Sequence, residues 1–435
     1  MTLAVVKADS RAGRRAVDRL LRRGEAVLDP PTVRRAERIV TDVRRRGDRA
    51  LLEYARKLDG VSVRSAAGLA LGPSPPGGHE GEGLLSGFAA ALERAIVAVE
   101  RFHAPQVRAG YRLDGDGVEL EELVTPLRRV GVYVPGGRAA YPSTVVMTVV
   151  PARIAGVKEI AVATPPGSYH ASPALRYTLE RLGITEVWGM GGAHAVAAFA
   201  YGTESVRRVD KIVGPGNAWV TAAKKLVAGD VAIDGIAGPS EVVILADGSD
   251  PAVEPGDVAA DLLAQAEHDP RAAAVLITAD PKLAKKVARE VEAQLAGLHT
   301  RATARASLAA FGVALVVPAM EDAAALADRI APEHLQLVGA AAEALAGRIA
   351  NAGAVFLGVS TPEVFGDYIA GPSHVLPTCG SARFASALGV EDFLRRSHRV
   401  RFSRTAAAHR AAAAAILADA EGLPAHAAAA RRRLG

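Results

Sequence analysis

Short apolar segments that end in glycine- or proline-rich turns recur from residue 130 onward, and each is followed by a segment of helical composition. The first four are residues 130–134, 159–164, 186–188 and 211–213, with turns such as PGG at 135–137 and GPGN at 214–217. Parallel sheets covered by helices on both faces have strands of this kind, which are apolar along their whole length. The alternation therefore predicts parallel α/β construction.

A second set of apolar segments follows at residues 241–246, 274–278, 314–317 and 354–357. Two sets predict two sheets, with the first set inserted into the domain that carries the second. The flanking regions differ in texture: residues 12–21, 31–58 and 85–102 have helical spacing, residues 74–83 form a polar loop, and residues 111–127 predict a hairpin. From residue 390 onward the alanine-rich chain predicts helix.

Composition excludes several classes of protein. A chain of 435 residues exceeds one ordinary core, and with 50% hydrophobic and 23% charged residues it is globular rather than disordered. The net charge of +5 is scattered and aromatic residues are 4%, so we expect no nucleic-acid partner. The single cysteine, Cys379, excludes an intramolecular disulfide framework and fits a reducing compartment. We identify neither a secretion signal nor a membrane-spanning run.

Two possible metal ligands lie one helical turn apart near the end of a predicted helix. Gln265 and His268 share a helix face, which Asp261 also occupies, and Pro270 follows. An imidazole and an amide oxygen can hold a divalent cation if further ligands arrive from elsewhere. The alternative is a solvated or capping face with no ligand.

Other polar residues also suggest a site. Glu333 and His334 adjoin Pro332, and an imidazole beside a carboxylate is suited to acid–base chemistry. The alternative is an exposed glutamate beside a packed histidine. Further along the chain, Asp367 could supply a carboxylate to a metal, and Ser240 offers a hydroxyl at a tight turn. From these residues alone we infer a metal-dependent α/β enzyme, such as a hydrolase. Its metal would be held by nitrogen and oxygen ligands at a site that is open to substrate.

The glycine-rich turns give a weaker signal. GPGNAW at 214–219 has the first two glycines of a dinucleotide-binding turn, but Trp219 occupies the place of the third. No acidic ribose anchor follows at the expected distance. GMGG at 189–192 is equally ambiguous, so both turns could be plain loop geometry.

The combination of these segments resembles the histidinol dehydrogenase family. The blocks that carry the resemblance keep their order from about residue 30 to the C-terminus. They are GVYVPGG (131–137), GGAHAVAAFAYGTESV (191–206), VDKIVGPGNAWVTAAKK (209–225), IAGPSEVVILAD (236–247), DLLAQAEHDP (261–270), APEHLQL (331–337), GDYIAGPSHVLPT (366–378) and the E-x4-H of Glu421 and His426.

This resemblance implies a cytoplasmic homodimer with one Zn²⁺ per subunit that catalyses the last step of histidine biosynthesis. L-histidinol would be oxidised to L-histidine in two NAD-dependent steps through bound histidinaldehyde. The implied fold has two incomplete Rossmann-like domains. We expect a helical segment at 1–30, a discontinuous catalytic and metal-binding domain at 31–130 and 241–388, an inserted NAD-side domain at 131–240, and a C-terminal helical arm at 389–435.

The resemblance also assigns residues. Gln265, His268, Asp367 and His426 are implied zinc ligands, and Glu333 and His334 are the implied catalytic pair. The implied substrate-binding residues are Ser240, Gln265, His268, His334, Asp367, Glu421 and His426. Tyr133, His194 and Asn217 are the implied cofactor positions. Glu421 and His426 would complete the site of the other subunit.

One position departs from the family pattern. His194 stands where the family usually has glutamine, and an imidazole offers fewer donor–acceptor combinations than an amide. A paralogous zinc- and NAD-dependent dehydrogenase of another small alcohol, such as a sulfonated diol, is the nearest alternative. A non-catalytic NAD-binding regulator is a second alternative.

Overall fold

The computed structural model describes residues 3–26, 28–72, 83–136 and 141–434, whose strands form two parallel sheets and one antiparallel sheet. The six-stranded sheet has the order β1-β11-β10-β9-β12-β13, and the five-stranded sheet has the order β6-β5-β4-β7-β8. In each sheet, later strands lie on both sides of the first long strand, as in doubly wound folds. This confirms the predicted α/β class, in which the strands of the second sheet are inserted in the chain between strands of the first. The strands of the first sheet are β1 (Ala4–Lys7), β9 (Glu241–Ala246), β10 (Ala273–Thr278), β11 (Val313–Val316), β12 (His334–Val338) and β13 (Ala354–Leu357), and those of the second are β4 (Arg129–Tyr133), β5 (Glu159–Thr164), β6 (Glu186–Gly189), β7 (Lys211–Val213) and β8 (Ala232–Ile233).

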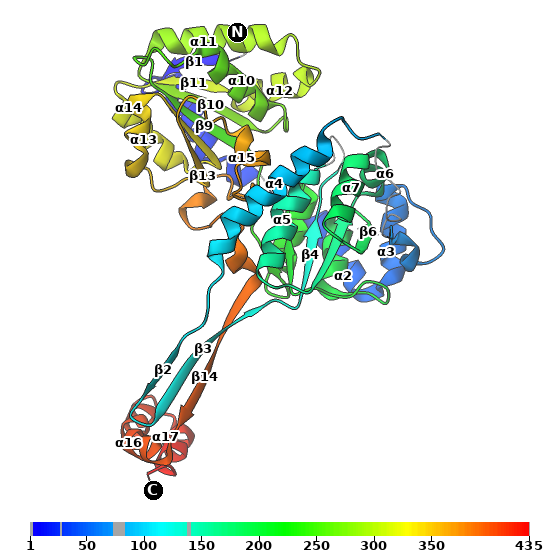
Figure 1. Cartoon of the computed structure of the whole chain (residues 1–435), viewed down its shortest axis with the longest axis vertical. Coiled ribbons are helices and arrows are strands. Elements are labelled where there is room, and N and C mark those ends of the chain that lie inside the picture. Colours follow the sequence, from blue (N-terminus) through cyan, green and yellow to red (C-terminus); the bar gives the residue numbers. More distant parts are fainter. Residues whose placement is uncertain (1–2, 27, 73–82, 137–140, 435) are drawn as a thin grey trace.

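Helices cover both faces of each sheet, because successive strand residues point to opposite sides (Figure 1). In β9, Val242 and Ile244 join one apolar core, whereas Val243 and Leu245 join the other. The helices on the first sheet are α10 (Pro255–Ala266), α11 (Pro281–Leu295) and α12 (Arg301–Phe311) on one face, and α1 (Arg11–Leu21), α13 (Met320–Ile330) and α14 (Ala340–Glu343) on the other. Those on the second sheet are α2 (Pro30–Arg46), α3 (Asp48–Tyr54), α8 (Gly192–Tyr201) and α9 (Ala218–Val227) on one face, and α4 (Phe88–His103), α5 (Pro142–Ile154) and α7 (Pro173–Arg181) on the other.

The N-terminal region differs from the sequence-based expectation. Residues 1–30 were expected to be helical, but Ala4–Lys7 forms β1 and pairs in parallel with β11 at the edge of the first sheet. In addition, α2 and α3 pack on the second sheet, although residues 31–130 were assigned to the first domain. The predicted loop at 74–83 lies, apart from Gly83, outside the described residues, as does the last glycine of the PGG turn.

The single helix expected at 31–58 is divided. Gly47 has a φ of +53° and separates α2 from α3, after which the chain forms a π-helical turn at Ala55–Asp59. A left-handed φ is easily adopted by glycine, which has no Cβ, so the helix axis changes direction there. This turn brings Asp59 to the second domain, where its carboxylate contacts Gly191 and His194 at the start of α8.

An antiparallel three-stranded arm projects away from both domains and carries the C-terminal helices at its tip (Figure 1). The hairpin predicted at 111–127 is confirmed as β2 (Arg112–Gly115) and β3 (Val118–Pro126). The expectation of helix from residue 390 was wrong for Leu394–Phe402, which forms β14 against β3. Helices α16 (Arg404–Ala420) and α17 (Pro424–Arg431) follow.

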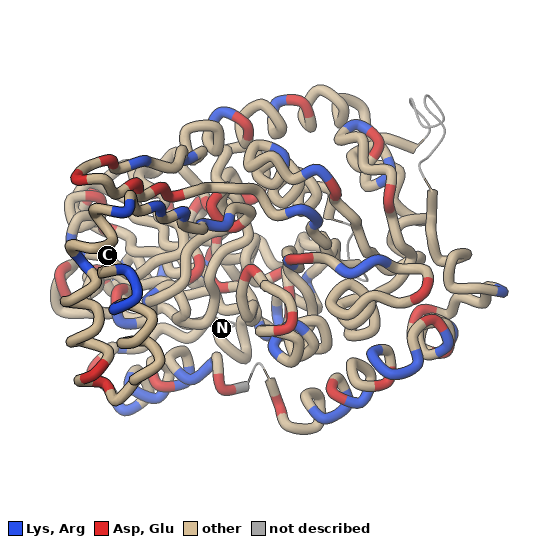
Figure 2. Tube along the Cα trace, turned by 90° about the horizontal axis from the view of Figure 1, so that it is seen from below, with Lys and Arg blue, Asp and Glu red and all other residues tan. Residues whose placement is uncertain are grey.

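Charge explains why the basic segment is a strand. Along the register of the arm, Arg399 lies 3.4 Å from Glu121 and Arg401 lies 3.8 Å from Glu119. Opposite charges on facing strand positions favour this pairing, a preference that helical periodicity alone does not reveal. Acidic and basic positions are interspersed along the rest of the trace as well (Figure 2). Within the described residues, no helix has the length and apolarity needed to cross a membrane.

Candidate active site

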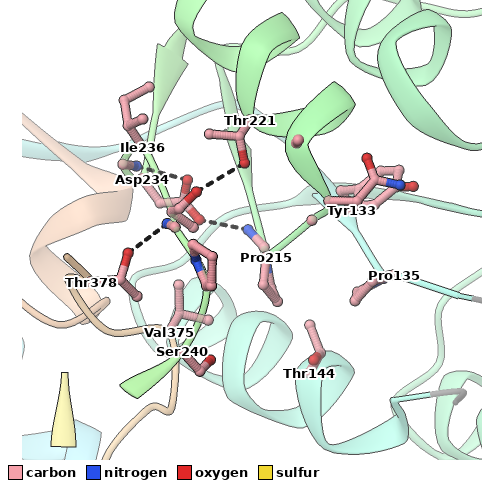
Figure 3. Close-up of a pocket in the computed structure, with 18 of the residues that line it drawn as sticks. Tyr133, Pro135, Thr144, Pro215, Thr221, Asp234, Ile236, Ser240, Val375 and Thr378 are labelled. Carbon is pink, nitrogen blue, oxygen red and sulfur yellow. Dashed lines mark hydrogen bonds between the residues drawn. The ribbon is translucent and has the colours of Figure 1, made fainter. Parts of the chain in front are cut away.

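A cavity of about 1330 Å³ lies between the two parallel sheets and contains most of the predicted site residues. From the second sheet it receives the carboxyl ends of β4 and β7, which is the topological switch point where doubly wound sheets bind ligands. From the first sheet it receives the opposite, amino ends of β9 and β12. Figure 3 shows Tyr133 and Pro215 on one side of this space and Ser240 and Thr378 on another.

Glu333 is fixed by a reciprocal pair of hydrogen bonds with Glu241. The Glu241 N–H donates to Glu333 Oε2 (3.0 Å), and the Glu333 N–H donates to Glu241 Oε1 (3.2 Å). Just before it, Ala331 ends α13 in the left-handed conformation, with a φ of +52°, and Pro332 follows. A non-glycine residue held there marks a backbone that its surroundings over-determine. Burial raises the pKa of Glu333 to about 7, against the opposing charge of His334, so this carboxyl can exchange a proton near neutral pH.

His334 begins β12 and lies among carboxylates. Its Nδ1–H donates to the Glu241 carbonyl (3.2 Å), which assigns the tautomer and leaves Nε2 directed toward Asp367 Oδ1, 3.7 Å away. Burial alone would lower the pKa of His334, but the charges of Glu333, Asp367 and Glu363 outweigh burial and raise the pKa to about 10. An imidazole placed in this way can donate and accept protons at Nε2.

Glu363 is a functional candidate that sequence analysis missed. It precedes α15 (Val364–Tyr368), is 1% exposed, and places Oε2 3.5 Å from His334 Nδ1. Within the described residues, neither of its carboxylate oxygens has a hydrogen-bond partner. Burial raises the pKa of Glu363 to about 8. Only its position in space marks it, since the segment TPEVFGD resembles an ordinary helix start.

The predicted metal ligands Gln265, His268 and Asp367 come together on one side of His334. His268 Nδ1–H donates to the Ala264 carbonyl (2.9 Å), which leaves Nε2 free, 3.8 Å from Asp367 Oδ2. Two ligands about 2.1 Å from a tetrahedral zinc are themselves about 3.4 Å apart, close to this separation. Gln265 is 1% exposed, and both of its amide atoms lack a partner in the described structure. A buried amide without partners fits a missing cation, so these residues are compatible with zinc.

The remaining predicted ligand does not reach this cavity within one chain. His426 lies in α17 and Glu421 follows α16, both exposed at the tip of the arm and neither lining the cavity (Figure 1). Among the residues that the structure describes, no group of three or more His, Cys, Asp or Glu side chains is arranged to hold a metal ion. Within the described residues, Gln265, His268 and Asp367 are the predicted ligands that line the cavity.

His374 connects the metal side to the second domain. Its Nδ1–H donates to the Asp367 carbonyl (3.1 Å), and the Thr144 hydroxyl of α5 donates to its Nε2 (3.3 Å). Burial lowers the pKa of His374, so a neutral imidazole is favoured and can serve as donor and acceptor at once. This histidine therefore has a structural role, since it connects Asp367 to α5.

The cofactor positions line the other side of the cavity. The Tyr133 hydroxyl accepts a hydrogen bond from the Gly192 N–H (3.0 Å), and burial raises the pKa of Tyr133 to about 12. The Asn217 side chain caps α9 by accepting from two backbone N–H groups. At Gly214, with a φ of +108°, a Cβ would lie 2.1 Å from the Tyr133 carbonyl, so only glycine allows this approach. The turn thus brings the start of α9 to the switch point, where anionic groups are favoured.

His194 lies in the first turn of α8 and is paired with Asp59. The His194 Nε2–H donates to Asp59 Oδ2 (2.7 Å), which also accepts from the Gly191 N–H (3.1 Å). The ring stacks on Tyr54 at a centroid distance of 6.2 Å. The departure from the family pattern is therefore accommodated by an acidic residue that sequence analysis did not select.

Comparisons with known proteins give a consistent result. The family model described as "Histidinol dehydrogenase" matches residues 24–434. "Histidinol dehydrogenase 2" of Nostoc sp. is 45% identical over 400 residues, covering 91% of each chain. "Histidinol dehydrogenase" of Synechococcus sp. is 46% identical over 397 residues, covering 91% of this chain and 90% of that one. The crystal structure of histidinol dehydrogenase from Elizabethkingia anophelis is similar with a TM-score of 0.86 and 31% identity, covering 100% of this chain and 98% of that one.

Proposed function

Because this chain belongs to the histidinol dehydrogenase family, we propose that it oxidises L-histidinol to L-histidine in two zinc-dependent, NAD-linked steps through bound L-histidinaldehyde. One observation carries the proposal: a single cavity joins glycine turns suited to a dinucleotide with a buried acid–base pair and three potential metal ligands. A hydride acceptor on one side and proton-transfer groups on the other are what an alcohol oxidation needs.

His334 is the proposed base for the alcohol proton. Its Nδ1–H is committed to the Glu241 carbonyl, so Nε2 is the atom that faces the cavity and exchanges protons. The carboxylates that raise its pKa include Asp367, and positive charge bound beside Asp367 would offset that effect and lower the pKa of His334 toward neutrality. With its pKa lowered in this way, His334 would accept a proton at Nε2 in each oxidation.

Glu333 is the proposed group that activates water in the second step. Its Oε2 accepts the Glu241 N–H, and its pKa of about 7 lets it take a proton from water attacking the aldehyde. Adjacent residues with separate duties allow two oxidations without release of the aldehyde. Ser240 lines the same cavity and is proposed to hydrogen-bond substrate.

Gln265, His268 and Asp367 would hold the zinc. Bound zinc would position the substrate through the nitrogen atoms of the substrate. Within the described residues, the amide of Gln265 has no hydrogen-bond partner, and His268 uses Nδ1 rather than Nε2 for its hydrogen bond to Ala264, so the amide oxygen and Nε2 can act as ligands. Tyr133, Asn217 and His194 would hold NAD, which would accept the hydride. On this chain, the starts of α8 and α9 face the cavity, where the positive ends of the two helix dipoles would favour a diphosphate.

The proposed assembly is a cytoplasmic homodimer with shared sites. The arm that carries Glu421 and His426 extends away from both parallel-sheet domains (Figure 1), and neither residue lines the cavity of its own chain. Several apolar side chains on the arm are exposed, including Val400 at 61%, Ile416 at 67% and Leu417 at 66%. Packing against a second copy would bury them and supply the missing ligand. The single cysteine fits a reducing compartment.

Formation of NADH in the presence of L-histidinol tests this function. We expect NADH from L-histidinol and from L-histidinaldehyde, with L-histidine as product and two NADH per histidinol. A sulfonated diol serves as the comparison substrate. NADH from the diol but not from histidinol would assign the chain to the paralogous activity instead.

A further inference from the structure

The Arg23 side chain contacts the loop that carries Ser240 and Glu241. Arg23 is the first residue of the 3-10 turn Arg23–Ala26 that follows α1, and it is only 5% exposed. The family model match begins one residue later, at 24. The sequence motifs that suggested the site do not include this residue.

The guanidinium group joins several acceptors at once. Nη1 donates to the Glu241 carboxylate in an ion pair whose two side chains are 2% and 5% exposed. Nη2 donates to the backbone carbonyls of Pro239 (3.0 Å), Ser240 (3.1 Å) and Arg271 (2.9 Å). The planar fork of arginine suits such simultaneous contacts, which a lysine ammonium cannot reproduce. These contacts fix both the backbone and the side chain of the 238–241 loop.

One peptide plane transmits this contact to the catalytic pair. The Ser240 carbonyl and the Glu241 N–H belong to the same trans peptide unit and point in opposite directions. Arg23 and the Ala273 N–H (3.0 Å) both donate to the carbonyl on one side, and Glu333 Oε2 accepts the N–H on the other. A donor on the carbonyl also polarises the unit and strengthens its N–H as a donor.

The Glu241 carboxylate gives a second connection. Its Oε2 pairs with Arg23, while Oε1 accepts the backbone N–H groups of Glu333 (3.2 Å) and Cys379 (2.8 Å). Its own carbonyl accepts from His334 Nδ1. Without the guanidinium, this buried carboxylate would be uncompensated beside Glu333 and would be expected to move.

We propose that Arg23 is a positioning residue for Glu333 and His334, acting through the Ser240–Glu241 peptide and the Glu241 carboxylate. This inference rests on the proposed function, because it assigns Arg23 to the proton-transfer steps of that reaction. Arg23 touches neither substrate nor cofactor in this role. It keeps the Glu333 carboxylate in position and keeps the His334 proton on Nδ1, as the two oxidations require.

The test compares Arg23→Ala, Arg23→Lys and Arg22→Ala. Arg22 is the matched control, because it adjoins Arg23 but is 71% exposed and, in the part of the chain that the structure describes, pairs only with Glu25. For each full-length variant, kcat and KM for histidinol, bound zinc and thermal unfolding would be measured. We expect kcat to fall by about 10²-fold in Arg23→Ala, the cost of a small misplacement of reacting groups. Arg23→Lys should lie between Arg23→Ala and the unsubstituted enzyme, and Arg22→Ala should be unchanged.

A purely structural role would lower the unfolding temperature without changing kcat per folded molecule. We therefore also expect added guanidinium ion, at concentrations far below those that unfold the protein, to restore part of kcat to Arg23→Ala but not to increase kcat of Arg22→Ala. Folded Arg23→Ala with normal kcat, or absence of rescue, would overturn the inference. If Arg23→Ala does not fold, kcat of folded Arg23→Lys decides: a normal value overturns the inference. Inactivity of the unsubstituted enzyme on histidinol would instead overturn the proposed function.

Discussion

The carboxylate of Glu363 lies 3.5 Å from His334 Nδ1, and neither of its oxygens receives a hydrogen bond from the described residues. When this carboxyl is ionised, its buried negative charge stabilises a neighbouring imidazolium. It therefore helps His334 to accept a proton, although it lies on the side of the ring away from the cavity.

Glu363→Gln should lower kcat about ten- to a hundredfold, because the imidazolium formed during proton transfer would lose its counter-charge, a part of the 10²–10⁴-fold that a positioned acid–base group supplies. Bound zinc should be unchanged, since Gln265, His268 and Asp367 remain. The control is Glu321→Gln, at an exposed position in the first turn of α13. Steady-state kinetics and metal analysis check both variants, and an unchanged kcat for Glu363→Gln would exclude this role.

His334→Asn and Glu333→Gln should affect the two steps differently. Loss of His334 should reduce turnover with both histidinol and histidinaldehyde by about 10²–10⁴-fold, because it accepts a proton in each. Glu333→Gln should impair oxidation of the aldehyde more than that of the alcohol, because only the aldehyde step needs activated water. Separate assays with each substrate measure this, and equal losses in Glu333→Gln would count against the water-activating role.

His268→Ala and Asp367→Ala should lower bound zinc, and chelators should inactivate the unsubstituted enzyme. Both changes remove a proposed ligand, because His268 Nε2 and Asp367 Oδ2 face each other at 3.8 Å. The hydrogen bond of His268 to the Ala264 carbonyl uses Nδ1, so it does not occupy Nε2. His299→Ala, at an exposed position after α11, is the control. Metal content by mass spectrometry checks the prediction. Stoichiometric zinc in both site variants would show that the ligands have been assigned wrongly.

Mixing two inactive variants should restore activity if sites are shared between subunits. In a hybrid of His334→Ala and His426→Ala, one of the two sites keeps both groups, so free exchange restores about a quarter of the sites. The control mixes His334→Ala with Asp367→Ala, whose defects both lie in the body of the subunit and leave no site intact. If subunits exchange but the first mixture stays inactive, the shared-site arrangement is wrong.

Acid stability should depend on the contact between Glu186 and Arg129. These side chains form two hydrogen bonds, at 2.5 and 2.9 Å, and Arg129 is buried. Burial would raise the pKa of Glu186, but Arg129 and Trp188 outweigh it and hold the pKa below its usual value. A lowered folded-state pKa stabilises the protein above the unfolded-state value and loses that contribution as the pH falls through the folded-state value.

Glu186→Gln should therefore lower the free energy of unfolding at neutral pH by about 1–3 kcal/mol and flatten its decline in acid. Glu37→Gln, at an exposed position of α2, should do neither. Urea unfolding at a series of pH values below neutrality measures both effects. A decline in acid as steep as that of the unsubstituted protein would contradict this explanation.

Local pattern determined much of the fold. Apolar runs bounded by glycine turns identified the strands of both parallel sheets, apart from β1, β8 and β12, and their order along the chain indicated the insertion. The pair Glu333 and His334, and the helix face of Gln265 and His268, were also visible, because these side chains are neighbours in sequence or one turn apart. The resemblance to a family supplied their roles.

Tertiary structure decided the rest, because it depends on contacts between distant segments. The proposed catalytic pair, Glu333 and His334, lies at the amino edge of its sheet, although the usual rule for parallel sheets places ligands at the carboxyl edge. Strand β14 forms because its basic residues meet an acidic partner strand more than 250 positions away, as Arg399 meets Glu121 across 278 positions. Arg23, Asp59 and Glu363 carry no local signal, since burial against partners far along the chain is what gives an ordinary charged side chain a specific function.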